Sequence, residues 1–259
     1  MSRTRPKALI ADASCAIGLV YADRLARRGY DVVLLARHSE RPSALAQVLR
    51  CETDATIEIL DVDLTMERDR KVAARFAELD LLINNLELPA GGPLVLGSTP
   101  SLDRLIDTNI KLYAWLAATA GGSMAKRRNG AVVNVASAVG LAPEFATGVY
   151  GATKAFAIAL TRTLHAELAC DNVYVQQVIA AATRTDVWPF DNCPPEPLPG
   201  VMTPQDLVDA AMVGFDLREP VTIPSLSAAD GWTQYENARN ALIFDLVNSD
   251  PASRYLKRS

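Results

Sequence analysis

Three side chains between positions 137 and 154 have types and spacing suited to acid–base chemistry. Tyr150 and Lys154 are four residues apart, so on a helix they lie on one face with their side chains close together. An ammonium group beside a phenol favours the phenolate, and we therefore expect a pKa of Tyr150 below its ordinary value of about 10. Such a phenol can act as a general acid or base near neutral pH. Ser137 precedes Tyr150 by 13 residues and can offer its hydroxyl to the same reacting oxygen.

Strands and helices alternate along the predicted chain, and this order decides where those side chains lie. Apolar runs predict strands at 8–11, 31–36, 56–60, 80–83, 130–136, 173–179 and 221–224. Helices are predicted at about 19–28, 43–51, 66–78, 102–126, 150–169, 204–217 and 231–247. Such alternation produces right-handed βαβ units, so we expect an α/β fold with a doubly wound sheet of about seven parallel strands and helices on both faces. Ser137 then follows the carboxyl end of a strand, where open parallel sheets bind ligands.

Composition and length indicate a single globular domain over residues 1–259. Of these residues, 49% are hydrophobic and 22% charged, which is typical of a protein with a large core. The formal net charge of −4 argues against a nucleic-acid-binding surface. No apolar run reaches the length of a membrane span and no secretory signal is visible, so we expect a cytoplasmic protein with no membrane partner. The 4 cysteines have neither disulfide nor metal-ligand spacing, which suits a reducing compartment and predicts no metal site.

Motifs along nearly the whole chain resemble those of the short-chain dehydrogenase/reductase family, in its main single-domain type. The stretch Ala-Asp-Ala-Ser-Cys-Ala-Ile-Gly at 11–18 is similar to the family's first-turn pattern Thr-Gly-x-x-x-Gly-x-Gly. Asn-Asn-Leu-Glu at 84–87 is similar to Asn-Asn-Ala-Gly, and Ala180-Ala181 stands at the place of a Pro-Gly pair. The resemblance implies a Rossmann-like fold and a nicotinamide dinucleotide cofactor.

Four positions match the family's catalytic tetrad without substitution: Asn109, Ser137, Tyr150 and Lys154. The resemblance implies that Tyr150 donates a proton to a carbonyl oxygen while hydride arrives from the nicotinamide, and that the reverse steps oxidise an alcohol. Ser137 would orient that oxygen, and Asn109 would anchor a water in the proton relay. Lys154 would lower the pKa of Tyr150 and bind the nicotinamide ribose. A Tyr-x-x-x-Lys pair alone is common in helices, whereas the added serine and asparagine make the match specific.

The cofactor side of the pattern departs from the family, since Gly18 alone remains of three turn glycines. Asp12 and Ala16 replace the other two, and Glu87 and Ala181 replace glycines elsewhere. Glycines there let the backbone approach a pyrophosphate and take torsions that other residues avoid, although Asp12 can adopt them better than most. A carboxylate about 4 Å from a phosphate repels it by up to roughly 4 kcal/mol at an effective dielectric constant of about 20. That repulsion corresponds to a loss of up to about a thousandfold in affinity.

Three interpretations of this turn stay open. Asp12 can obstruct the phosphate, or it can accept a hydrogen bond from a ribose hydroxyl beside a helix N-terminus that favours anions. The segment can also be a tight turn that holds no nucleotide. Cys15 lies in the turn, and nothing nearby in the sequence marks it as a nucleophile.

The resemblance implies a cofactor site drawn from several parts of the chain: Asp12, Ser14, Cys15, Ile17, Gly18, Arg37, Asp63, Leu64, Asn85, Tyr150, Lys154, Thr183 and Thr185. Arg37 ends the second strand, where an acidic residue suits NAD and an arginine suits the 2′-phosphate of NADP, so NADP is favoured and NAD possible. The alternatives are a solvated arginine at 37 and a helix N-cap at Asp63. Thr183 and Thr185 can likewise serve only as loop hydrogen-bonding groups.

Two C-terminal segments have predicted roles of their own. The proline-rich stretch 188–204 is expected to be an irregular flap over the substrate, and 231–259 a C-terminal helix and tail. Trp188 and Phe190 in the flap can cover the substrate or pack locally.

His165 is expected to be packed within its helix rather than catalytic. The helices at about 102–126 and 149–169 resemble those that pair subunits in the family, which implies a homodimer or homotetramer.

The sequence thus predicts an NADP-preferring oxidoreductase that interconverts a carbonyl and a secondary alcohol on a small, partly apolar molecule. The alternative from another class is a catalytically silent or cofactor-impaired family member that acts as a binding or scaffold protein. A third hypothesis keeps the enzyme but gives it NAD or a weakly bound cofactor. The altered glycines motivate the second and third hypotheses, and the intact tetrad favours the first.

Overall fold

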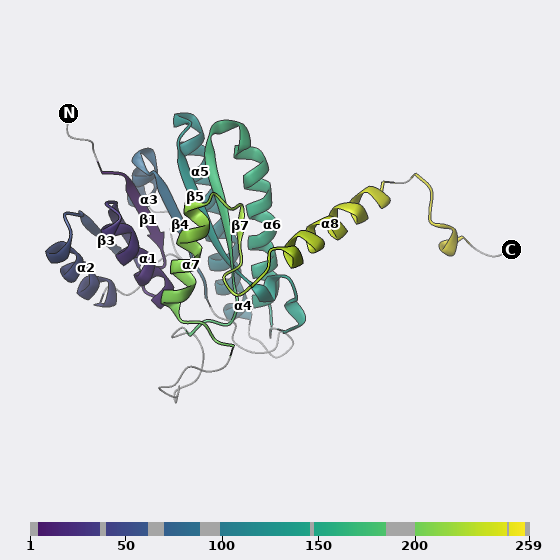
Figure 1. Ribbon diagram of the computed structural model, residues 1–259, viewed down its shortest axis with the longest axis horizontal. Coiled ribbons are helices and arrows are strands. Elements are labelled where there is room, and N and C mark those ends of the chain that lie inside the picture. Colours follow the sequence, from purple (N-terminus) through teal and green to yellow (C-terminus); the bar gives the residue numbers. More distant parts are fainter. Residues whose placement is uncertain are drawn as a thin grey trace. The chain divides into compact units, whose positions relative to one another are not determined.

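Seven parallel strands form one sheet in the computed structural model, in the order β3-β2-β1-β4-β5-β6-β7 (Figure 1). The strands are β1 (Lys7–Ala11), β2 (Asp31–Ala36), β3 (Ile57–Asp61), β4 (Leu81–Asn84), β5 (Gly130–Ser137), β6 (Val173–Ala180) and β7 (Val221–Thr222). The structure describes residues 5–36, 40–61, 70–88, 99–145, 148–184, 200–247 and 249–256. The predicted α/β class and the order of the strands along the chain are confirmed.

Helices connect the strands and pack on both faces of the sheet. They are α1 (Ala16–Arg27), α2 (Glu40–Glu52), α3 (Arg70–Arg75), α4 (Thr99–Ile106), α5 (Tyr113–Arg127), α6 (Tyr150–Leu168), α7 (Pro204–Asp216) and α8 (Asp230–Asp245). Residues of α1, α2 and α7 share a core with one face, while α5 and α6 lie side by side against the other (Figure 1). Because both faces are covered, the central strands are buried over most of their length, which explains why apolar runs predicted them.

The predicted helix at 102–126 is interrupted by a π-helical turn. Asp107–Leu112 forms this turn between α4 and α5. Isolated π turns within helices are rare overall, and those that occur are often at functional sites. The turn contains Asn109, whose side chain is buried.

The sheet order creates a crevice between β1 and β4. From β1 the chain builds the sheet through β2 and β3 toward one edge, whereas β4 to β7 extend it toward the other. Ligands of such sheets bind beyond the carboxyl ends of the strands at this switch of direction. The turn after Ala11 and the loop after Asn84 are therefore the two walls of the crevice.

The chain divides into two compact units, Met1–Pro224 and Ser225–Ser259. The first unit contains the whole sheet, and the second contains α8. A single domain over 1–259 stays a prediction. Among the described residues, no helix combines the length and the apolar character needed to cross a bilayer.

Candidate active site

Tyr150 and Lys154 lie on the first two turns of α6. The Lys154 ammonium is 5.5 Å from the centroid of the Tyr150 ring, and Lys154 is only 5% exposed. The structure therefore brings the predicted acid–base pair together in a place where water screens its charges weakly.

Ser137 ends β5 and leads into a short 3-10 turn, Ala138–Gly140, that packs against α6. A Cβ on Gly140 would lie 2.7 Å from the backbone carbonyl of Lys154, closer than real Cβ atoms come to such groups. Glycine at 140 thus lets the turn press against the helix at Lys154. This contact positions the strand end that carries Ser137 beside the helix that carries Tyr150.

The Asn109 side chain binds the loop that follows β4. Its Oδ1 accepts a hydrogen bond from the Leu88 N–H at 2.7 Å, and its Nδ2 donates to the Leu88 carbonyl at 2.9 Å. Nδ2 also lies 3.2 Å from the hydroxyl oxygen of Thr153, the residue before Lys154. The amide therefore ties the π turn, the β4 loop and α6 together.

Glu87, from the loop after β4, reaches the catalytic pair directly. The Tyr150 hydroxyl donates to Oε2 of Glu87 at 3.0 Å, and the same oxygen lies 2.5 Å from the Lys154 ammonium. In the sequence, Glu87 stands out only as a replaced glycine of the cofactor pattern. The missed signal was a carboxylate at the carboxyl end of β4, where the fold brings the loop to a lysine.

The predicted low pKa of Tyr150 is wrong for this arrangement. Burial raises the pKa of Tyr150 to about 12; Lys154 lowers it, and the charge and hydrogen bond of Glu87 raise it further. Burial disfavours the charged form of Lys154, yet Glu87 and the neighbouring phenols outweigh burial and raise the pKa of Lys154 above its ordinary value. At neutral pH the pair therefore consists of a protonated phenol and an ammonium group.

A buried chain of amides and hydroxyls fixes β4 to α6. Asn84 Nδ2 donates to Oδ1 of Asn134 on β5 at 3.1 Å and to the Tyr113 carbonyl at 3.0 Å. Asn134 Nδ2 in turn donates to the Thr161 hydroxyl on α6 at 3.0 Å. Buried amides that find partners in this way rigidify a core. The loop that carries Glu87 and the helix that carries Lys154 are thus set by one network.

The turn after β1 adopts a glycine-like conformation without its first glycine. Asp12 has φ of +57°, in the left-handed region that aspartate tolerates better than most residues, as its place in the sequence predicted. Its Oδ1 accepts a hydrogen bond from the Ser14 N–H at 3.2 Å, and Asp12 is 2% exposed. The carboxylate is therefore turned onto its own loop.

Gly18 is the position of this turn that admits no side chain. A Cβ there would lie 2.3 Å from the Asp12 carbonyl oxygen. Cys15 caps α1, since its Sγ accepts from the Gly18 N–H at 3.4 Å and from Nδ2 of Asn85 at 3.0 Å. Burial, followed by the charge of Asp12, raises the pKa of Cys15 to about 12, so the thiol is not activated as a nucleophile. The Ile17 side chain joins the core, which leaves its backbone for the crevice.

Of the remaining predicted cofactor residues, Thr183 lies in the part of the chain that the structure describes, and four others do not. The Thr183 hydroxyl donates to the Ala181 carbonyl at 3.0 Å, which is the loop hydrogen bonding that its alternative interpretation proposed. Arg37, Asp63, Leu64 and Thr185 lie outside the described residues, as do 188–199 of the predicted flap.

Comparison with known proteins places this geometry in a family. The sequence model of the family described as short chain dehydrogenase matches residues 6–192. The chain belongs to this short-chain dehydrogenase family. The expectation of an NAD(P)-dependent dehydrogenase or reductase is thereby confirmed at the level of the family.

Individual relatives of this short-chain dehydrogenase extend along most of its length. An uncharacterized oxidoreductase of Staphylococcus saprophyticus is 27% identical over 218 residues, which cover 82% of this chain and 91% of that protein. A short-chain dehydrogenase from Sphingobium yanoikuyae, solved in complex with NADPH, is 43% identical with a TM-score of 0.90, over 96% of this chain and 100% of that one. The bulky-bulky ketone specific alcohol dehydrogenase from Comamonas testosteroni is 40% identical with a TM-score of 0.89, over 98% and 100%.

The turn of this short-chain dehydrogenase fits a dinucleotide in two respects. The left-handed Asp12 and the absent side chain at Gly18 leave the backbone close to the start of α1, whose first N–H groups have no partner within the helix. The Asp12 carboxylate is already bonded to Ser14 and is not aimed freely at a phosphate. The replacements at the glycine positions therefore change which residues form the turn more than they change its backbone conformation.

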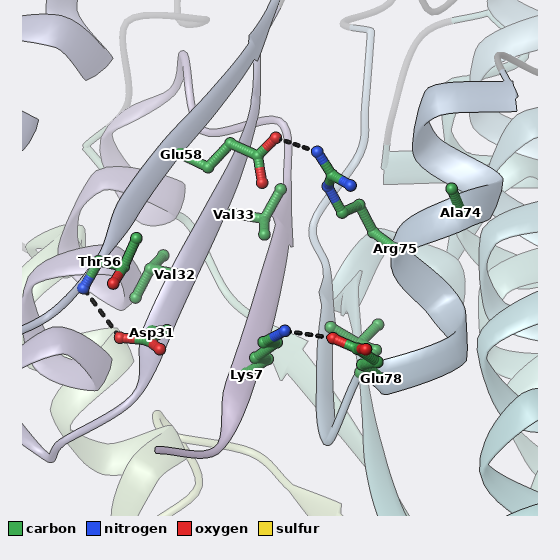
Figure 2. Close-up of a pocket in the computed structure, with 10 residues that line it drawn as sticks. Lys7, Asp31, Val32, Val33, Thr56, Glu58, Ala74, Arg75 and Glu78 are labelled. Atoms are coloured by element: carbon green, nitrogen blue, oxygen red, sulfur yellow. Dashed lines mark hydrogen bonds and ion pairs between the residues drawn. The ribbon is translucent and has the colours of Figure 1, made fainter. Parts of the chain in front are cut away.

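A cavity of this short-chain dehydrogenase, of about 390 Å³, lies at the amino ends of β1, β2 and β3 (Figure 2). Figure 2 shows its charged side chains paired with each other, Lys7 with Glu78 and Arg75 with Glu58. Asp31 Oδ1 accepts from the Thr56 N–H at 2.8 Å. The cavity lies at the end of the sheet remote from Tyr150, so we assign it no part in the catalytic site.

One further prediction about this region is wrong. His165 was expected to be packed within its helix, but it is exposed on α6. It lies about three turns beyond Lys154 on the helix axis, at the end away from the crevice. A catalytic role for His165 therefore has no support.

Proposed function

We propose that this protein is an NADP-preferring oxidoreductase that interconverts a carbonyl and a secondary alcohol, with Tyr150 as its general acid and base. The observation that carries the proposal is the pairing of the half-buried Tyr150 with the buried Lys154, beside the strand end that carries Ser137. A phenol and an ammonium group held together at the carboxyl end of a parallel sheet suit proton transfer to an oxygen. No other described part of the chain combines these groups at the crevice.

In the proposed reduction, Tyr150 gives its proton to the carbonyl oxygen of the substrate. Its raised pKa keeps that proton in place at neutral pH until the substrate binds, and the Lys154 ammonium, which lowers that pKa, favours its release. The Ser137 hydroxyl orients the same oxygen, and the Lys154 ammonium stabilises the phenolate that forms. Asn109, through its bonds to Leu88, holds the β4 loop in place and is proposed to anchor a water of the proton relay. In the oxidation Tyr150 takes the proton back.

When bound, the nicotinamide supplies or accepts the hydride, which no side chain can do. The turn residues Asp12, Ser14, Cys15, Ile17 and Gly18 would hold the pyrophosphate, with Asn85 on the facing wall. Lys154 and Tyr150 would bind the nicotinamide ribose. We propose the remaining contacts for Asp63 and Leu64 at the adenine, and for Thr183 and Thr185 at the carboxamide.

NADP preference rests on Arg37 and on one relative. An arginine after β2 suits the 2′-phosphate that distinguishes NADP from NAD. The Sphingobium relative was solved with NADPH. An Arg37→Asp variant tests the assignment, because it should weaken NADPH binding and leave NADH binding unchanged or stronger.

We propose a ketone with a partly apolar body as the carbonyl substrate. Support comes from the Comamonas relative, which is described as specific for bulky-bulky ketones. A homodimer or homotetramer and a cytoplasmic location stay predictions from the family resemblance.

Turnover tests the proposed function. The purified protein is incubated with NADPH and a panel of ketones that carry two large substituents, and both NADPH loss and alcohol formation are followed. We expect one alcohol formed per NADPH oxidised, and no reaction in Tyr150→Phe. NADPH binding without turnover on the whole panel would favour the binding or scaffold alternative.

A further inference from the structure

One carboxylate oxygen contacts both members of the acid–base pair. Oε2 of Glu87 accepts the Tyr150 hydroxyl at 3.0 Å and lies 2.5 Å from the Lys154 ammonium. Tyr150 has a single O–H to donate. While that proton points at Glu87 it cannot point at a carbonyl oxygen, so this arrangement and a productive one exclude each other.

The pairing is strong because it is shielded. The side chain of Lys154 is 6% exposed and that of Glu87 is 18% exposed. Charge-assisted hydrogen bonds of this kind are about twice as strong as neutral ones, and burial limits their screening by salt. A ligand that takes over Lys154 and Tyr150 must replace both bonds.

The backbone beside Glu87 is fixed on both sides. Leu86 is buried at 1% exposure, and Asn109 holds both the N–H and the carbonyl of Leu88. Release of the carboxylate therefore requires rotation of the Glu87 side chain rather than movement of the loop. Its charge also contributes, after the larger effect of burial, to raising the pKa values of Tyr113 of α5 and of Cys15 in the turn after β1.

We propose that Glu87 is an internal gate of the active site: its carboxylate holds Tyr150 and Lys154 as a closed pair until nucleotide and substrate displace it. This inference rests on the proposed function, because it assigns Lys154 to the nucleotide ribose. Glu87 is a positioning residue in this account, since it acts on Tyr150 and Lys154. The gate makes nucleotide affinity weaker than the open site would allow, and it keeps the Tyr150 hydroxyl directed at Glu87 in the free protein.

Three variants separate the gate from a general charge effect. Glu87→Gln keeps an oxygen acceptor and removes the charge, and Glu87→Ala removes both. Glu144→Gln is the matched control, because Glu144 is an exposed carboxylate of the short turn Pro143–Phe145 that packs near the start of α6. NADPH affinity is measured by calorimetry on each folded protein.

We expect Glu87→Gln and Glu87→Ala to bind NADPH about tenfold more tightly, which corresponds to about 1.4 kcal/mol, and Glu144→Gln to match the wild type. Unchanged affinity in both Glu87 variants would overturn the gate. Weaker binding would also overturn it and would make Glu87 a ligand of the nucleotide.

A second measurement needs no nucleotide. Tyrosine labelled with ¹³C at Cζ reports each phenol by NMR, and Tyr150→Phe assigns the Tyr150 signal. We expect the pKa of Tyr150 to fall below about 12 in Glu87→Gln, because the carboxylate charge is lost while burial remains, and the signal of the buried Tyr21 shows that the core is intact. An unchanged pKa would contradict the gate. Absence of NADPH binding in every variant, with the NMR shift present, would instead refute the proposed function.

Discussion

Two parts of the site, β5 with α6 and β1 with α1, match the family pattern by different means. On the β5–α6 side the family's residue types are all present, from Asn109 to Lys154, and the structure brings them to one place. On the β1–α1 side two of three glycines are gone, yet Asp12 takes φ of +57° and binds its own loop. A catalytic position thus requires a particular chemical group. A glycine position instead requires a particular backbone torsion and free space beside the backbone. Only the second kind of requirement can be met by another residue.

The largest expected effect is on the catalytic side, in Tyr150→Phe. Loss of the phenol that gives its proton to the substrate should lower turnover by about a thousandfold or more, within the range that general acid–base groups contribute. NADPH affinity should change by less than about threefold, because the ring remains. Steady-state kinetics and calorimetry measure the two quantities. Substantial residual turnover would remove Tyr150 from the role of acid.

The next effect is on the turn, in Gly18→Ala. The added Cβ would meet the Asp12 carbonyl oxygen at 2.3 Å, so the turn must shift. We expect a loss of about 1 to 3 kcal/mol in unfolding free energy and at least tenfold weaker NADPH binding. Gly122→Ala on α5 is the control, because its Cβ would contact nothing within 4 Å and a helical alanine adds about 0.5 to 1 kcal/mol. Equal behaviour of the two variants in denaturant titration would refute the clearance argument.

How far the sequence predicted this molecule depends on what each feature requires. Strands such as β1 and β5 were predictable because burial on both faces demands continuous apolar runs. The π turn at Asp107–Leu112 left no such pattern, and its Asn109 bonds to Leu88, which is 21 positions away in the sequence. The pKa of Tyr150 was mispredicted because spacing shows a neighbouring lysine but neither the depth of burial nor Glu87.

A smaller effect is expected when the turn regains its glycines. Asp12→Gly together with Ala16→Gly should tighten NADPH binding by about tenfold or less, well below the unscreened limit, because the carboxylate already bonds to Ser14. Calorimetry with NADPH measures the change. If affinity falls instead, Asp12 is a ligand of the cofactor rather than an obstruction.

The smallest effect belongs to the amino end of the sheet. Glu58→Gln removes one ion pair of the cavity in Figure 2, between side chains that are 36% and 42% exposed. Exposed pairs contribute about 0 to 1 kcal/mol, so stability should change little and turnover not at all. A marked loss of turnover would show that this end of the molecule takes part in catalysis.

The central claim is that the altered turn still binds a dinucleotide beside an intact acid–base pair. Calorimetric titration of the wild-type protein with NADPH and then with NADH tests it most directly. We predict binding of NADPH with a Kd in the micromolar range and binding of NADH at least about tenfold weaker. No heat of binding for either nucleotide at about millimolar concentration would contradict the claim and leave the intact tetrad without its hydride source.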